Sequence, residues 1–169
     1  MNKLRIYYQK ARGSTFYRWL FNQVLWRTVP FNHPHKLRVS GFEEDALTIE
    51  APYKRANLNH VKGIHACLLA TLCEYAVGLS LMLQIDPRQY RLLLKSIHMT
   101  YHYQVRSTVK IRWGITAGAI EEIKQALNNS DAILKTFTAE VYDVAGNHIC
   151  TGEIEWQLKA WNKVTTSAP

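Results

Sequence analysis

One apolar segment constrains this chain more than any other feature. Residues 66–83, "ACLLATLCEYAVGLSLML", contain a single charged residue, Glu74. A helix that is apolar on all sides must be covered on all sides, by protein or by lipid. An acid near the middle of a membrane span would cost about 2.5–3.5 kcal/mol. We therefore expect this segment to be the buried central helix of a folded domain.

The rest of the chain supplies the cover for that helix. Alternation of apolar and polar residues, which is typical of antiparallel strands with one buried face, recurs along the chain. The alternating segments are residues 36–42, 46–51, 97–106, 109–116, 132–142 and 148–161. In this pattern Tyr101, Tyr103 and Trp113 fall on the core side, and residues 117–129 have the spacing of a short amphipathic helix. The sequence predicts an α+β fold in which six antiparallel strands wrap around the central apolar helix.

Length and charge divide the chain into a domain and an arm. The 169 residues are enough for one domain, which we place at residues 31–162, with a frayed tail at 163–169. Residues 1–42 contain eight of the 21 basic residues and none of the 13 acidic ones, so the remainder is neutral. Residues 1–30 are expected to form an extra, basic amphipathic N-terminal helix.

Three interpretations of this arm remain open. Phe16, Leu20 and Val24 have helical spacing, so the arm could be a helix that covers the domain and turns its basic side to water. It could instead make weak contact with an anionic membrane surface, or attract a phosphorylated ligand. An arginine-rich, acid-free start also occurs in organelle transit peptides, although these rarely contain so many large aromatic residues.

Several classes of site and location are not indicated. Cys67, Cys73 and Cys150 have no metal-type spacing, and the "NHPH" at residues 32–35 has no partner acid or cysteine nearby. We expect no metal and no bound cofactor. No uninterrupted apolar run follows the first basic residues, as a secretory signal would require, and the cysteines suit a reducing compartment. We expect a cytoplasmic protein that does not bind nucleic acid.

The candidate site lies at the start of the apolar helix. The stretch "NHVKGIHACLLATLCEYAVG" places Asn59 six residues before His65, Gly63 in the loop between them, and Glu74 nine residues after His65. This arrangement resembles hotdog-fold acyl-CoA thioesterases of the phenylacetyl-CoA type, and more narrowly an uncharacterised bacterial hotdog family usually labelled as thioesterases. The chain departs from the motif in two ways. Ala66 and Cys67 replace a glycine pair, and Glu74 stands where the family usually has Asp.

The resemblance implies a fold, an assembly and a reaction. Hotdog subunits pair their sheets edge to edge, so it implies a homodimer, possibly assembled further into a tetramer, in which the acid of one subunit faces the loop of the other. It implies hydrolysis of an acyl-CoA or acyl-carrier thioester by a carboxylate that activates water or attacks the carbonyl. An amide N–H at the helix start would hold the thioester oxygen.

Elementary chemistry supports these roles. The first turn of a helix offers unpaired N–H groups, so the Ala66 amide is a candidate oxyanion donor. Burial raises the pKa of a carboxyl toward the working pH, which suits Glu74 as a general base. Asn59 could position water or the carbonyl, and His65 is the remaining candidate catalytic residue. The structural alternatives are that Glu74 is only hydrogen-bonded in the core, that His65 only caps the helix, and that Asn59 is an ordinary loop residue.

The remaining candidate residues are assigned to substrate binding or support an alternative function. We assign Gly63, His60 and Arg106 to substrate contacts, with Arg106 near the phosphates of coenzyme A. Hotdog dehydratases of 3-hydroxyacyl thioesters pair a loop His with a helix Glu fourteen residues later and a Gly three after the His, offsets that His60, Gly63 and Glu74 match. The loop lacks the prolines and glycine of those enzymes. A non-catalytic acyl-binding module is the third alternative.

Overall fold

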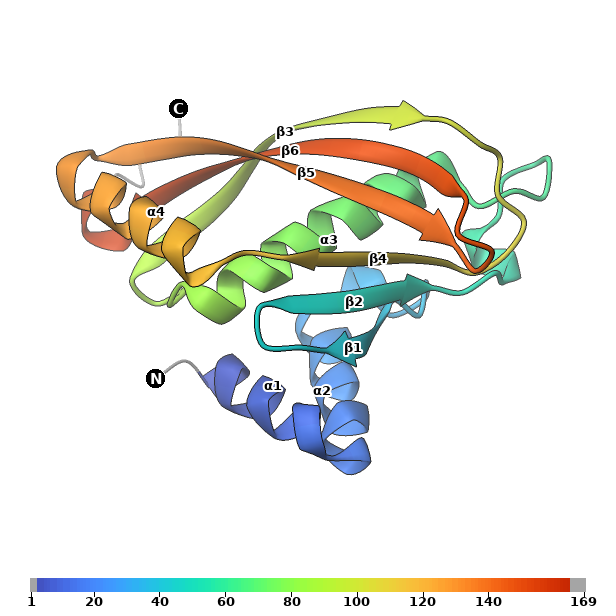
Figure 1. Cartoon of the computed structure of the whole chain (residues 1–169), viewed down its shortest axis with the longest axis horizontal. Helices are drawn as coiled ribbons and strands as arrows, with labels where there is room; N and C mark the ends of the chain where they lie inside the picture. The colour runs from blue at the N-terminus through green and yellow to red at the C-terminus, as the bar shows by residue number, and fades with distance from the viewer. Residues whose placement is uncertain (1–2, 165–169) are drawn as a thin grey trace.

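The computed structural model describes residues 3–164 and shows one curved sheet around one central helix (Figure 1). All six strands are antiparallel, in the order β1-β2-β4-β5-β6-β3. The strands are β1 (Arg38–Phe42), β2 (Ala46–Ala51), β3 (Tyr90–Tyr101), β4 (Val109–Gly114), β5 (Ala132–Asp143) and β6 (His148–Ala160). The helices are α1 (Lys3–Gly13), α2 (Thr15–Thr28), α3 (Ala66–Gln84) and α4 (Ala117–Asn129). This is the hotdog arrangement that the sequence predicts.

The central helix is α3. It is long and apolar enough to cross a bilayer, but 67% of its most apolar window is buried inside the domain. Leu72, Ala76 and Leu79 are fully buried, and strands β2, β4, β5 and β6 pack against the helix. The sheet therefore provides the cover that the apolar sequence requires.

The N-terminal arm consists of two helices rather than one. Ser14 separates α1 from α2, and its backbone is extended. In α2 the buried residues are Phe21 and Leu25, whereas Phe16 and Val24 are exposed. The expected apolar stripe thus faces solvent, because α2 carries a second apolar side that packs on the domain instead.

Strand β3 starts and ends earlier than the alternation predicts. The register shifts between Leu94 and Ser96, and this bulge changes which residues face the core, so the alternation is visible only after it. Beyond Tyr101 the chain leaves the sheet. Tyr101 and Tyr103 are 46% and 59% exposed, so their assignment to the core was wrong.

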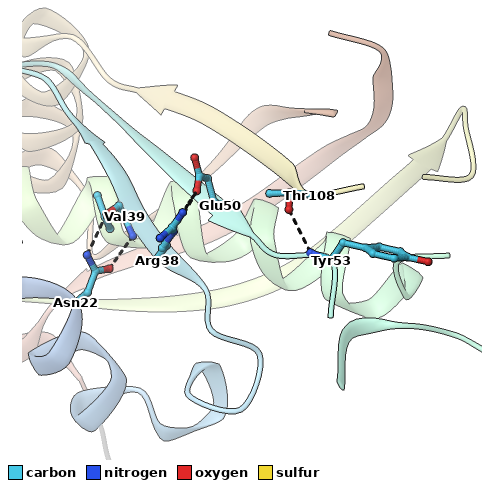
Figure 2. Close-up of polar contacts among 6 residues, drawn as sticks. All are labelled: Asn22, Arg38, Val39, Glu50, Tyr53 and Thr108. Carbon is cyan, nitrogen blue, oxygen red and sulfur yellow. Dashed lines mark hydrogen bonds and ion pairs between the residues drawn. The ribbon is translucent and has the colours of Figure 1, made fainter. Parts of the chain in front are cut away.

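The arm also closes one edge of the sheet. The side-chain amide of Asn22 donates to Val39 O (3.0 Å) and accepts from Val39 N (2.7 Å), as Figure 2 shows. The indole of Trp26 donates to Leu37 O at 2.6 Å. Helix α2 therefore satisfies backbone groups of β1 and of Leu37, just before it, that would otherwise be open to another strand. Strand β3, at the other edge, has no such cover in residues 3–164.

Candidate active site

The loop before α3 is organised by the side chain of Asn59. Its Oδ1 accepts hydrogen bonds from the N–H groups of Val61 (3.1 Å) and Gly63 (2.9 Å), and its backbone N–H donates to Gly63 O. Lys62 takes a left-handed conformation (φ 62°) to complete the turn. The carbonyl end of Asn59 thus holds the loop, while its Nδ2 has no partner among the described residues and remains available to a ligand.

Gly63 lets this loop approach the segment that follows β3. A Cβ at position 63 would lie 3.0 Å from side-chain atoms of Gln104 and 3.4 Å from Val105 O. The next residue, Ile64, donates its N–H to Val105 O at 2.9 Å. Gly63 therefore serves close packing of two backbones and does not itself line a cavity.

The first turn of α3 presents one free amide. His65 caps the helix, since its Nδ1 accepts from Cys67 N (3.1 Å) and its carbonyl accepts from Leu68 N and Leu69 N. By contrast, the N–H of Ala66 has no hydrogen-bond acceptor within residues 3–164. It lies at the positive end of the helix dipole, where a developing negative charge is stabilised.

A cavity of about 340 Å³ lies at the start of α3. Asn59 and Ala66 line it together, so the structure brings two predicted site residues to one place. Its other lining residues come from the loop, from α3 and from the end of β3. They are Ile64, Leu69, Tyr101, His102, Tyr103, Gln104 and Val105. The mixture of apolar walls with a few polar groups suits an acyl thioester.

Glu74 lies elsewhere on α3. It is eight residues from Ala66, about 12 Å along the axis, and does not line the 340 Å³ cavity. Its side chain is half-buried, and its carboxylate has no hydrogen-bond partner among the described residues. Burial raises the pKa of this carboxyl above its ordinary value. The Glu74 carboxylate is therefore free to accept or donate a proton. Within one subunit, however, it is separated from the Ala66 amide.

The remaining predicted residues lie outside this cavity. His65 lines a separate space of about 230 Å³ with Phe31, His35 and Thr71, and its ring is committed to the helix cap. His60 is exposed at the tip of the loop. Arg106 is exposed and donates to Val61 O at 3.3 Å, which joins the loop to the segment after β3.

Two tyrosines and a histidine of the cavity were not predicted as site residues. The hydroxyl of Tyr101 donates to Ala66 O at 3.1 Å, so it fixes the end of β3 against the start of α3. His102 lies 3.3 Å from Thr151 Oγ1 through its Nε2, and its ring is near that of His148. The alternating pattern concealed them, because it continues past the point where the chain leaves the sheet.

The described part of the chain shows no metal-binding site. Within residues 3–164 no group of three His, Cys, Asp or Glu side chains is placed to hold a metal ion. Cys67, Cys73 and Cys150 are all free thiols.

Solved structures with the same fold include several thioesterases. A Pseudomonas aeruginosa protein described as a probable thioesterase has a TM-score of 0.76 at 16% identity, over 82% of this chain and 93% of that one. A Chlorobaculum tepidum protein of unknown function has a TM-score of 0.72 at 12% identity, over 82% and 91%. A Haemophilus influenzae thioesterase has 0.67 at 13% identity, over 92% and 97%. At these identities the likeness establishes the fold.

Sequence comparison places the chain in a family. No curated protein matches it. A family model, described as a domain of unknown function, matches residues 17–158, which include most of α2, strands β1 to β5, most of β6 and the candidate site. The chain therefore belongs to the DUF4442 family.

Proposed function

We propose that this protein hydrolyses acyl thioesters, carried by coenzyme A or by an acyl-carrier protein. The observation that carries the proposal is the free N–H of Ala66, a residue that starts α3 and lines a cavity of about 340 Å³. Such a donor stabilises the oxyanion of acyl transfer, and loss of one typically costs about 10²–10³-fold in rate. The thioesterases among the solved neighbours support the same reaction.

The separation of Glu74 from Ala66 favours a site shared between two subunits. Strand β1 is closed by Asn22 and Trp26, so β3 is the sheet edge left to pair with a second copy. The side of α3 that carries Cys67, Ala70, Thr71 and Glu74 is the least buried part of that helix. In the proposed homodimer, Glu74 of one subunit serves the cavity of the other as base or nucleophile.

A panel of acyl-CoA thioesters tests the reaction. We expect thiol release with wild-type protein, and loss of release with Glu74→Ala while the variant remains folded. A dehydratase would instead change the absorbance of an enoyl thioester and depend on His60. An acyl-binding module would do neither, yet its melting temperature would rise with acyl-CoA. Either of those results would refute the hydrolase.

Mixing two inactive variants tests the shared site. Ala66→Pro removes the amide donor and Glu74→Ala removes the acid. If each site takes one group from each subunit, a mixed dimer contains one intact site and one doubly defective site. Random exchange then restores about a quarter of wild-type activity, because half of the dimers are mixed and each has one working site of two. If both groups act within one subunit, mixing restores nothing.

A further inference from the structure

The outer side of α2 is apolar where the solvent-facing side of a helix is normally polar. Phe16, Trp19, Leu20 and Val24 share this side with the polar Gln23, opposite the buried Phe21 and Leu25. Phe16 is 63% exposed and Trp19 is 58% exposed. The Phe16 ring contacts the rings of Tyr17 and Trp19, and Trp19 also lines a hollow between α2 and β1. Phe31, just beyond the helix, is 64% exposed as well.

The N-terminal arm that carries this apolar side also contains cations without a carboxylate partner. Of the eight basic residues in residues 1–42, Arg12 and Arg38 form ion pairs with Glu44 and Glu50. Arg18 donates to backbone carbonyls of the arm. The five others have no carboxylate partner among residues 3–164: Lys3, Arg5, Lys10, Arg27 and Lys36. Arg27 lies on the apolar side of α2 itself, one turn beyond Val24.

We propose that this α2 surface, formed by Phe16, Trp19, Leu20, Val24 and Arg27, binds the headgroup region of an anionic lipid bilayer. Tryptophan and phenylalanine partition to the membrane interface. Each Lys or Arg close to an anionic surface strengthens binding about fivefold. Since residues 43–169 carry no net charge, the attraction comes from the arm and orients α2 toward the lipid.

Other occupants fit the same features less well. A second copy of the chain would bring two positive arms together, and their repulsion opposes self-association. A nucleic acid would be attracted by the positive charges, but the exposed side of α2 consists mainly of apolar side chains. The surface is also free in the proposed dimer, because α1 and α2 lie beside β1 and β2, away from β3 (Figure 1).

Vesicle co-sedimentation of the full chain tests the proposal. We expect binding to vesicles of mixed phosphatidylcholine and phosphatidylglycerol, little binding to phosphatidylcholine alone, and release by high salt. Arg27→Gln should weaken binding about fivefold, and Phe16→Ser with Trp19→Ser should weaken it by about 10-fold or more. All these residues are exposed, so the melting temperature should not change.

Matched controls lie on other elements. Val144→Ser removes an exposed apolar side chain in the β5–β6 turn, and Lys135→Gln removes an exposed cation on β5. Neither should alter binding. Vesicles should also shift tryptophan emission to shorter wavelength, and Trp19→Phe should remove most of that shift while binding persists.

Three results would overturn the proposal. The first is failure to bind the anionic vesicles. The second is binding that the controls reduce as much as the α2 variants do. The third is loss of self-association or of nucleic-acid binding in the α2 variants when no vesicle binding is seen, which would assign the surface to that partner instead. None of these results depends on thioester hydrolysis, so the two proposals fail separately.

Discussion

Glu74 and Gly78 lie one turn apart on α3, and the missing side chain at 78 leaves room for the Glu74 carboxylate beside the Trp156 ring. A Cβ at position 78 would lie 3.5 Å from Glu74 Oε1 and 3.0 Å from Trp156 Cζ2. The indole N–H of Trp156 is buried without a hydrogen-bond partner in the described chain. Gly78 therefore sets the space in which the candidate acid sits.

A larger side chain at position 78 should disturb the packing against Trp156 and the position of the Glu74 carboxylate. We expect Gly78→Val to lower the free energy of unfolding by about 1–3 kcal/mol, because the indole is rigid and cannot yield. The control is Gly118→Val in α4, where a Cβ would meet nothing within 4 Å. Urea denaturation measures both. Equal stability of the two variants would contradict the close packing at Gly78.

Removal of the Ala66 N–H should abolish catalysis but spare the fold. Ala66 is the first residue of α3, a position that accepts proline. His65 before it has φ −68° and ψ 135°, which a following proline also favours. We expect Ala66→Pro to lower kcat by about 10²–10³-fold, whereas Ala66→Ser, which keeps the amide, should retain activity. A fully active proline variant with an unchanged melting temperature would exclude the oxyanion role.

The ionisation of Glu74 should link stability to pH. Burial raises the pKa of this carboxyl above its ordinary value of 4.5, so the folded protein holds the proton more tightly than the unfolded chain does. The free energy of unfolding then falls as pH rises from the unfolded pKa through the raised folded pKa. Glu74→Gln removes this loss.

We therefore expect Glu74→Gln to be more stable than wild type at neutral pH, with the difference shrinking toward about pH 4. Chemical denaturation across the pH range measures it. A difference that does not vary with pH would show that Glu74 titrates normally. Hydrolysis by wild-type protein should rise with pH along a limb whose midpoint lies above 4.5.

Two substitutions of Asn59 should distinguish the role of its side-chain oxygen Oδ1 from that of its side-chain nitrogen Nδ2. Asn59→Asp keeps the oxygen that accepts from Val61 and Gly63, so the melting temperature should hold. Asn59→Ala loses both bonds and should cost about 1 kcal/mol. If Nδ2 contacts substrate, the two variants should lose hydrolysis to a similar extent. Normal activity of Asn59→Asp would limit Asn59 to shaping the loop.

Much of the fold could be predicted because burial leaves a simple pattern. The predominantly apolar residues 66–83 identified α3 to within one residue of its end at Gln84. The alternating segments gave six antiparallel strands, as observed. The bulge between Leu94 and Ser96 concealed the start of β3. The side of α2 that is buried could not be predicted, because both sides of that helix are apolar.

The candidate site was predicted only where it depends on local sequence. The loop and the helix start, Asn59 and Ala66, share a cavity because they are close along the chain. Tyr101, His102 and Gln104 reach the same cavity because the chain leaves the sheet after Tyr101, a tertiary event without a local signal. The capping role of His65 was among the alternatives that the residue type suggested.

The paired hydrogen bonds between Asn22 and Val39 also limit how many copies can join. A sheet with two open edges can add strands at either end and grow into a filament. In this protein the β1 edge is occupied, because the Asn22 side chain makes the backbone hydrogen bonds that a neighbouring strand would make. Only the β3 edge could pair with another molecule, so strand addition would stop at two molecules. A single amide would thus give the assembly a fixed size.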